Sequence, residues 1–416
     1  MGGDHQQDGD QQQKVPHRDL RRAERRQGMR AFLLVAPLLF FVLAVFVYPI
    51  GTVLLRAVAS PEFPEEMPRT SQVLSAWDVN QALPGQAWEA LALDLADLKE
   101  RKTVGKVANA LNVEYAGARS LVSATVRKAD TFTPPWRDAL IEANAGWEKP
   151  EIWLAMKSLS SSITARFFLA AVDMRADPSA GISLQPEDRR IYVSIFLRTF
   201  MIGAVVTFWC LLLGYPVAYL LASLPLRYSN LLMILVLLPF WTSLLVRTTA
   251  WIVLLQNQGV VNSLLVWGGL VADGARVELV FNRTGTIIAM THILLPFMIL
   301  PLYSVMKTIP PSYMRAARSL GANQFTAFRR IYVPQTAAGI MAGSLLVFIL
   351  ALGYYITPAL VGGESGTLIS NMIAFHIQKT LNWGLAAALS AILLVCVLVL
   401  YWAYSRLARA DGLRLS

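Results

Sequence analysis

Six apolar segments, each long enough to cross a lipid bilayer, constrain the fold of this 416-residue chain more than any other feature. A membrane-spanning helix needs about 20 predominantly apolar residues. Within lipid, the backbone of such a segment must satisfy its own hydrogen bonds, as a helix does. We therefore expect an all-α, polytopic membrane protein with six transmembrane helices. The predicted spans are residues 31–55, 194–222, 230–255, 285–306, 336–358 and 384–405.

The first segment and a shorter seventh one need separate interpretations. The apolar core of residues 31–55 is too long for a cleaved signal peptide, and no cleavage site with small residues follows it closely. The stretch VVNSLLVWGGLVA at 260–272 is too short to span the bilayer. We predict that it is an interfacial helix.

Charged residues are scarce in this chain and concentrated in one block. They form 15% of the sequence, whereas a typical soluble domain has about 25%. Residues 59–190 hold 33 of the 64 charged side chains, and only four acids follow residue 190. Apolar residues spaced three and four apart in this block, such as Trp88, Leu91 and Leu95, predict helices. The block is therefore a helical insertion, and it is either an addition without a role or a docking surface for an external partner.

Basic residues at the ends of the apolar segments predict the orientation, because Lys and Arg favour the cytoplasmic side. They gather in residues 1–30, at Arg227, in the loop 307–330 and after residue 405. With six spans these places share one side, so both termini are expected in the cytoplasm and the insertion outside. Residues 1–30 lack an apolar pattern and are expected to be a disordered basic tail. Residues 408–416 are a second cytoplasmic tail.

Several classes of function are disfavoured by the composition. The net charge of +10 follows from topology and does not indicate nucleic-acid binding. Cys210 and Cys396 lie in apolar runs, so we expect no metal site. The four histidines are scattered, and we therefore assign no catalytic residue. The sequence also lacks the phosphate-binding motif G-x-x-x-x-G-K-[ST], so any ATP must be bound by another polypeptide.

The stretch PPSYMRAARSLGANQFTAFRRIYVP at 310–334 predicts two short helices in a basic cytoplasmic loop. Two prolines suit the first turn of a helix, and Ser312 is expected to cap it. Gly321 permits a bend with positive φ. The predicted shape is a compact knob whose small residues allow another protein to approach closely. Met314, Ala317 and Leu320 are expected on one side of the first helix, and Pro334 is expected to end the element before the fifth span. Aromatic residues follow the bend at a spacing of three and four: Phe325, Phe328 and Tyr332.

This loop resembles the coupling motif in the permease subunits of ABC importers. That motif runs Glu-Ala-Ala, three residues, Gly, nine residues, Ile, one residue and Leu-Pro. The chain differs from it at Arg315, in place of Glu, and at Val333, in place of Leu. The resemblance implies that residues 312–334 insert into a separate ATPase subunit and couple it to transport. The matching residues are Ala316, Ala317, Gly321, Ile331 and Pro334.

Other stretches look like the spermidine/putrescine-type subfamily of these permeases. The likeness covers residues 31–58, a first transmembrane helix, and 191–407, a five-helix core, but not the insertion. It implies import of a small solute, with a polyamine as the first expectation, across a bacterial inner membrane. It also implies ABC ATPase subunits that bind ATP, a second permease subunit and a periplasmic solute-binding protein. The stretches are LLLGYPVAYLLASLP (211–225), LLPFWTSLLVRTTAW (237–251), GVVNSLL (259–265), LPFMILPLYSVM (295–306) and ALGYYITPALVGG (351–363).

Two alternatives remain open. The first is a permease of the same family for another small solute, such as an amino-acid derivative or an opine. The second is an ion-coupled secondary transporter, which would normally show intramembrane acids and inverted repeats. Neither feature is visible in the sequence.

A candidate translocation path is drawn from polar and aromatic residues in the spans. Arg247 lies in the third span, where a charge should face protein, water or the outer headgroups. His292 in the fourth span either is a buried hydrogen-bonding group or lines the path. Tyr354 stands where related permeases often have an acid, so a cationic substrate would need tyrosine oxygens, carbonyls and aromatic faces. The candidates are Trp241, Arg247, His292, Tyr354, Tyr355 and Thr357, and Pro239, Pro296 and Pro358 are expected to break or kink the helices around them.

Overall fold

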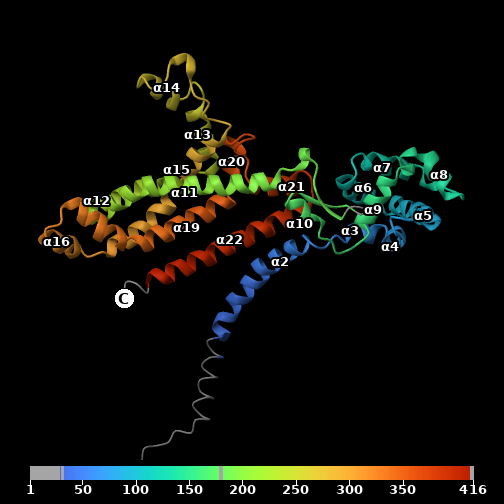
Figure 1. The fold of residues 1–416 in the computed structure, drawn as a ribbon, viewed down its shortest axis with the longest axis horizontal. Coiled ribbons are helices and arrows are strands. Elements are labelled where there is room, and N and C mark those ends of the chain that lie inside the picture. The colour runs from blue at the N-terminus through green and yellow to red at the C-terminus, as the bar shows by residue number, and fades with distance from the viewer. Residues whose placement is uncertain (1–28, 30–31, 178–180, 413–416) are drawn as a thin grey trace, which may run out of the picture. The chain divides into compact units, whose positions relative to one another are not determined.

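The computed structural model describes residues 29, 32–177 and 181–412 and is built almost entirely of helices (Figure 1). Within that part of the chain, the strands are the antiparallel pair β1 (Met174–Asp177) and β2 (Gly181–Leu184). The predicted all-α class is confirmed apart from this hairpin. The predicted basic tail lies outside the described residues except for Met29, as do residues 413–416 of the second tail. The chain divides into two units, Met1–Leu55 and Arg56–Ser416.

The first unit contains one apolar helix, Phe32–Leu55. It includes the π-helical segment η1 (Leu43–Val47) and ends with α2 (Tyr48–Leu55). None of its side chains is buried. A helix that is apolar on all sides, without a covered face, is typical of a membrane span.

The insertion folds into a helical domain with a hydrophobic core of its own. On α5, Ala87, Leu91, Leu95 and Leu98 recur every three or four residues and are all buried, so one face of the helix packs inward. Each large apolar side chain buried in this way contributes about 1.5–3 kcal/mol. The helices of the domain are α3 (Glu62–Glu66), α4 (Pro68–Ala76), α5 (Gly85–Arg101), α6 (Val104–Glu114), α7 (Ala118–Arg127), η2 (Ala129–Thr131), α8 (Trp136–Ala143), η3 (Ala145–Glu148) and α9 (Pro150–Leu159). The last helix of the insertion, α10 (Arg166–Ala171), packs instead in a separate cluster with later residues such as Tyr192 and Leu385.

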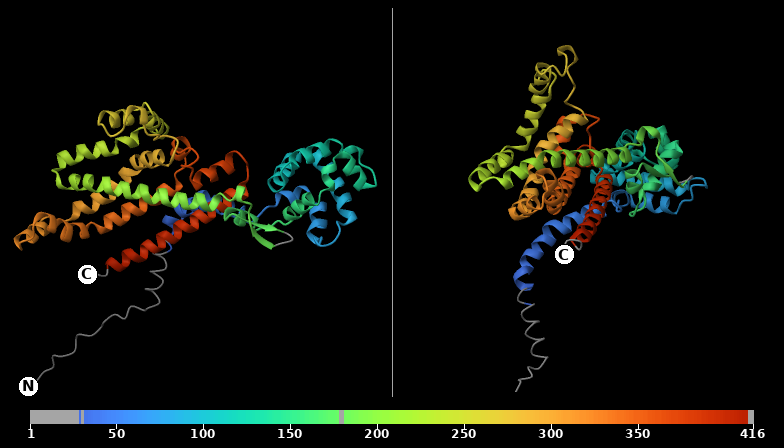
Figure 2. Two further views of the ribbon diagram at one scale, coloured as in Figure 1. Left: turned by 45° about the horizontal axis from the view of Figure 1, so that its top comes forward. Right: turned by 60° about the vertical axis from the view of Figure 1, so that its left-hand side comes forward.

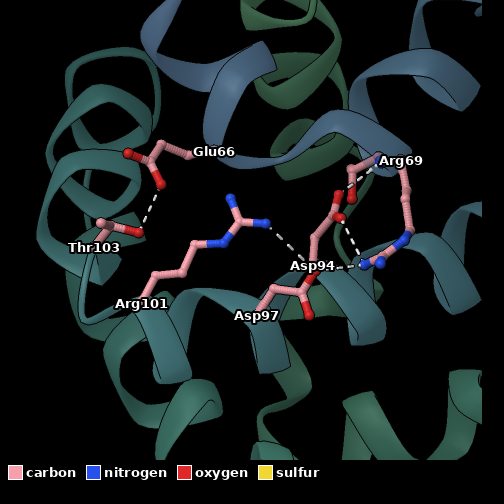
Figure 3. Close-up of polar contacts among 7 residues, drawn as sticks. Glu66, Arg69, Asp94, Asp97, Arg101 and Thr103 are labelled. Atoms are coloured by element: carbon pink, nitrogen blue, oxygen red, sulfur yellow. Dashed lines mark hydrogen bonds and ion pairs between the residues drawn. The ribbon is translucent and has the colours of Figure 1, made fainter.

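A buried carboxylate ties α4 to α5 (Figure 3). Asp94 is fully covered, its Oδ2 accepts the backbone N–H of Thr70 at 2.8 Å, and its Oδ1 lies 3.3 Å from Arg69 Nη1. Burial raises the pKa of Asp94 above its ordinary value, because the loss of water outweighs these favourable contacts. Removing one member of this contact would leave the other buried without a hydrogen-bond partner, which destabilises the fold.

Glu66 ties α3 to the start of α6 and has the opposite pKa shift. Hydrogen bonds from Lys106 at 2.8 Å and from Thr103 at 2.6 Å lower the pKa of its carboxyl. A carboxyl with a lowered pKa stabilises the folded state above its unfolded pKa, and this contribution is lost as the pH falls through the lowered value.

We predict that Asp94→Ala destabilises the insertion by about 1–3 kcal/mol, because a buried N–H would lose its acceptor. Asp97→Ala is the matched control. Asp97 binds the same Arg69 at 2.8 Å from the same helix but is 34% exposed, so its loss should cost less than about 1 kcal/mol. Limited proteolysis of the full-length chain over a temperature series measures both variants. Equal losses would contradict the argument from burial.

Two hydrogen-bonded chain segments and a capped helix connect the insertion to the remaining helices. Ser60 N donates to Ser162 O at 2.9 Å and Thr164 N to Val58 O at 2.7 Å, so the chain enters and leaves the domain side by side. The short helix η4 (Glu187–Arg189) follows β2 and leads to residues 191, 192 and 193. The backbone N–H groups of these three residues donate to the carboxylate of Asp173, just before β1, at 3.1, 3.0 and 2.9 Å. A negative charge stabilises the start of a helix, here α11 (Tyr192–Ser223).

Three helices, α11, α15 (Arg283–Thr308) and α19 (Ala337–Gly353), form the centre of the remaining fold. Glycines let them approach closely around the buried Met298 of α15. A Cβ added at Gly214 of α11 would lie 3.2 Å from that side chain, and one added at Gly343 of α19 would lie 2.8 Å from it. The other elements are α12 (Leu226–Leu237), η5 (Leu238–Trp241), α13 (Leu244–Leu255), α14 (Val260–Trp267), η6 (Asp273–Ala275), α20 (Ile356–Val361), α21 (Ile369–Gln378) and α22 (Trp383–Gly412).

Among the described residues, four helices are long and apolar enough to cross a membrane, or up to six if each of two bent helix pairs is one span. The predicted third span, 230–255, is not one helix. It breaks between Leu226–Trp241 and Leu244–Trp267, which meet at 96°. Pro239 lies in the last turn before the break, where its missing N–H removes a helical hydrogen bond. The four helices are Phe32–Leu55, Tyr192–Ser223, Arg283–Thr308 and Trp383–Arg406.

The predicted fifth span, 336–358, also needs correction. Its helix α19 ends at Gly353 and forms a 60° bend with the preceding segment Gln324–Gln335. Pro358 lies in the first turn of the new helix α20, a position that suits proline. Pro296, by contrast, lies inside the continuous α15. The predicted interfacial stretch contains the short helix α14.

Candidate functional site

Residues 310–335 form a helical hairpin, here called the basic hairpin. Gly321 makes its bend with φ +89°, so the predicted positive φ is confirmed. The N–H groups of Gly321 and Ala322 donate to Arg318 O and Ala317 O at 3.0 and 3.1 Å, which closes the end of the first helix. The hairpin consists of α16 (Pro311–Ser319), α17 (Gln324–Ala327), the π-helical segment η7 (Phe328–Tyr332) and α18 (Val333–Gln335).

The two helix starts in the hairpin are built differently from the prediction. The predicted cap at Ser312 is wrong, because Ser312 is the second residue of α16 and no side chain caps that helix. Asn323 caps α17 instead, with its Oδ1 accepting the Thr326 N–H at 2.7 Å. Pro334 was expected to end the element, but it lies inside α18, one residue before that helix ends.

Aromatic rings anchor the hairpin to the end of α11. Phe328 and Tyr332 stack with centroids 5.7 Å apart, and Tyr219 of α11 meets them edge-on at 5.4 and 5.2 Å. Tyr215, one turn earlier on α11, places its hydroxyl 3.2 Å from Thr336 Oγ1. Aromatic pairs of this geometry contribute about 0.5–1.5 kcal/mol beyond burial. A force on the hairpin would therefore be transmitted to α11.

The opposite surface of α16 is uncovered. Arg315, Ala316 and Arg318 are exposed, and Leu320 is 89% exposed. Met314, expected on the same side as Leu320, instead packs against the core. In the part of the chain that the structure describes, no acid forms a salt bridge with the arginines of this hairpin. The hairpin thus presents a basic surface, with the exposed Leu320 at its tip, that another molecule can contact.

Within the second unit, the basic hairpin and the insertion lie at opposite ends of α11, α15 and α19 (Figures 1 and 2). Helix α11 connects the two ends. Its first residues are capped by Asp173 of the insertion, and its C-terminal part holds Tyr215 and Tyr219, which contact the hairpin. One helix therefore contacts both peripheral parts.

Arg247 is held by the break in the third predicted span. Its guanidinium donates to the carbonyl oxygens of Pro239 and Thr242, the latter at 3.0 Å, and to Thr242 Oγ1 at 3.3 Å. The Pro239 carbonyl also accepts the Thr242 N–H at 3.2 Å, so the side chain of Arg247 adds to the contacts that hold the break. Arg247 thus stabilises the bend between the two helices. Trp241 is 75% exposed, and none of its described contacts is with another candidate residue.

Two of the other candidate residues, Thr357 and His292, contact α13. The buried hydroxyl of Thr357 on α20 lies 3.2 Å from Thr248 Oγ1, and His292 Nδ1 of α15 accepts the Trp251 Nε1–H at 3.1 Å. Tyr354 and Tyr355 contribute carbonyls that accept hydrogen bonds from Ser370 Oγ and Asn371 Nδ2, at 2.6 and 2.7 Å. The structure therefore brings α13, α15 and α20 together with polar side chains at their contacts.

Comparison with known proteins identifies the family. Residues 211–410 match the model of the binding-protein-dependent transport system inner membrane component family. Over 220 residues, 52% of this chain and 79% of the relative, the sequence is 37% identical to the spermidine/putrescine transport system permease protein PotB of Escherichia coli strain K12. The chain belongs to this family. It is a multi-pass permease of a bacterial inner membrane and a subunit of an ABC importer.

Other relatives of this permease are more distant. The inner membrane ABC transporter permease protein YdcU of Escherichia coli K12 is 34% identical over 235 residues, covering 53% of this chain and 73% of YdcU. A solved bacterial ABC transporter involved in importing the polysaccharide alginate has 18% identity and a TM-score of 0.44, covering 54% of this chain and 80% of that one.

Sequence reasoning missed residues that connect helices of this permease. Tyr215 and Tyr219 are spaced four apart, like Phe328 and Tyr332, and this matched spacing was the available signal. Thr248 and Trp251 carried no signal, because their partners lie on other helices more than 40 residues away. The family match spans the basic hairpin and the candidate path, whereas the insertion lies outside it.

Proposed function

We propose that this permease imports a polyamine such as spermidine or putrescine, which a periplasmic binding protein delivers and a partner ATPase drives. The observation that carries the proposal is the 37% identity to PotB proteins over 76–79% of their length, because those proteins are named for spermidine/putrescine transport. A second permease subunit would complete the path. The chain itself would be no enzyme, and alone it is expected to hydrolyse no ATP.

In this proposal the basic hairpin is the contact with the ATPase. Three features support it: α16 is bare, the bend at Gly321 is rigidly hydrogen-bonded, and Tyr219 ties the hairpin to α11. A packed element of this kind transmits rigid-body shifts. Arg315, in place of the usual Glu, would require an acidic or neutral partner surface.

For the topology, we propose six spans with each bent pair counted as one, both termini in the cytoplasm and residues 59–190 outside. The arginines of the hairpin and the exposed position of the insertion at the other end of α11 support this assignment. We predict that an impermeant maleimide labels Ser120→Cys from the outside of intact cells and Phe325→Cys only after the inner membrane is opened. The reverse pattern would overturn the topology.

The path in this proposal runs between α13, α15 and α20. Threonine hydroxyls and the carbonyls of Tyr354 and Tyr355 could accept hydrogen bonds from ammonium groups, and the aromatic face of Trp251 could add cation–π attraction. Arg247 would shape the bend and would not bind a cation.

A second solute class is favoured by one observation. The candidate path contains Arg247 and, among its described candidate residues, no carboxylate. A small solute that carries a carboxylate, such as an amino-acid derivative or an opine, would suit this charge balance better than a polyamine.

The experiment is uptake into vesicles that contain the full complex with its binding protein. We expect labelled spermidine to accumulate only with ATP at the ATPase and to be competed by putrescine. Uptake driven by a sodium or proton gradient without ATP would contradict the proposal. Competition by opines but not by putrescine would replace the polyamine with the second solute class.

A further inference from the structure

A cavity of about 820 Å³ lies between the insertion and the first residues of α11 and α22. The insertion contributes parts of α9, α10 and β1 to its wall. The other side includes Tyr192, the first residue of α11, and Leu385, the third residue of α22. Sites for small molecules usually have volumes of about 300–1,000 Å³. This cavity is separate from the candidate path, because none of the candidate path residues lines it.

One wall of the cavity lies where two candidate spans begin. Both α11 and α22 start at this end, and in the proposed topology it is the periplasmic surface of the inner membrane. Trp383, the first residue of α22, is 38% exposed, and the guanidinium carbon of Arg56 lies 5.4 Å from its ring centroid. Tryptophan and the ends of long basic side chains are typical of the level of the lipid headgroups. The cavity is therefore expected at the height of the headgroups of the outer leaflet.

Charges of both signs line the cavity. Four basic and three acidic side chains contribute to its wall, which leaves a net charge of +1. Arg166 Nη1 lies 3.3 Å from Glu114 Oε1, and Arg166 Nη2 donates to Ser60 Oγ at 2.8 Å, so these two opposite charges are paired. Lys157 donates to the carbonyl of Leu74 at 3.0 Å and keeps its positive charge. This near balance favours a ligand that itself carries both charges over a simple cation or anion.

Glu151, Asp188 and Arg189 are the lining groups that are available to a ligand. All three are exposed, and their side chains have no hydrogen bond or ion pair within the described part of the chain. A guanidinium donates to phosphate oxygens, and a carboxylate accepts hydrogen bonds from an ammonium group. Leu169 and Ile191 line the same cavity and supply an apolar surface for the first carbons of a lipid tail.

We propose that this cavity binds the headgroup of a zwitterionic phospholipid that carries a phosphate and a primary ammonium group, as phosphatidylethanolamine does. Arg189 binds the phosphate, Asp188 and Glu151 accept hydrogen bonds from the ammonium group, and the acyl chains stay in the bilayer beside α11 and α22. A lipid bound in this way contacts the insertion and two spans at once, and so holds the insertion at the membrane surface. The inference rests on the proposed topology and is independent of the transported solute.

Photo-cross-linking in nanodiscs tests this site. The assembled complex is placed in phosphatidylcholine bilayers that contain a small fraction of phosphatidylethanolamine with a photoreactive group near its glycerol, and labelled peptides are mapped by mass spectrometry. We expect labelling within residues 165–192 and 382–385. Arg189→Gln and Glu151→Gln should each lower it about three- to fivefold, as the loss of one exposed ion pair would.

Arg137→Gln and Glu142→Gln are the matched controls. Both residues are exposed on α8, have no side-chain contacts among the described residues and do not line the cavity. These two variants should be labelled like the wild type. Unlabelled phosphatidylethanolamine should suppress the labelling, and phosphatidylglycerol, which has no ammonium group, should suppress it less.

Four results would overturn the inference. The first two are a wild-type complex without labels at the cavity and equal labelling of the cavity variants and the control variants. The third is better competition by phosphatidylglycerol than by phosphatidylethanolamine, since the site would then select an anion. The fourth is equal competition by soluble glycerophosphoethanolamine, because the ligand would then be a free solute. The experiment measures no uptake, so each of these results leaves the proposed transport function standing.

Discussion

Gly321→Val should lower ATP-driven uptake by about tenfold or more while the chain still inserts and folds. The bend at this residue has φ +89°, which a β-branched residue adopts only with strain of about 1–2 kcal/mol. No atom lies within 4 Å of an added Cβ, so the effect is one of backbone conformation and not of a clash. Valine would change the angle between α16 and η7. Movements of the ATPase would then no longer be transmitted correctly to the transport path.

Gly321→Asn is the matched control, because asparagine tolerates positive φ better than other side chains. It adds a Cβ at the same place and should retain most of the uptake. Uptake and ATP hydrolysis are measured in the same vesicles. If the valine and asparagine variants transport equally well, the bend is not what couples hydrolysis to uptake.

Ala317→Trp should prevent the ATPase from assembling with the permease. Ala317 is half-buried on α16, next to the exposed Ala316, and the small side chains leave a flat surface for close contact. An indole there would hold the partner away and remove packing along the whole helix. We expect copurification of the ATPase to fall by about tenfold, as a loss of about 1.4 kcal/mol would produce.

Ala272→Trp makes the same change at an exposed position before η6, far along the chain from the hairpin, and should copurify normally. Normal copurification of the Ala317→Trp chain would show that α16 does not contact the ATPase closely.

The sequence predicted the helices of this protein well where the bounds of a helix depend only on its own residues. Apolar length alone located the end of the first helix at Leu55 and the start of α22 at Trp383 to within about a residue. It failed at residues 242 and 354, where helices break. There the chain leaves helical geometry because Arg247 and Ser370 satisfy the freed carbonyls, and those contacts depend on tertiary structure.

In the candidate site, too, features set by local backbone conformation were predictable and features set by tertiary contacts were not. Gly321 was predictable, since its role depends on local backbone conformation. Ser312 was misjudged because two adjacent prolines move the helix start to residue 311, ahead of the serine. The role of Asp173 was beyond prediction: it binds backbone groups that are 18 or more residues away and carry no side-chain signature.

The measurement that tests the coupling account most directly is cross-linking from the tip of the basic hairpin. A photoreactive maleimide on Leu320→Cys, at a residue 89% exposed in the chain alone, should capture the ATPase subunit in the assembled complex. The same reagent on Ser120→Cys, in the insertion, should not capture it. Capture of the ATPase from residue 120, or from neither position in a complex that hydrolyses ATP and transports, would contradict the account.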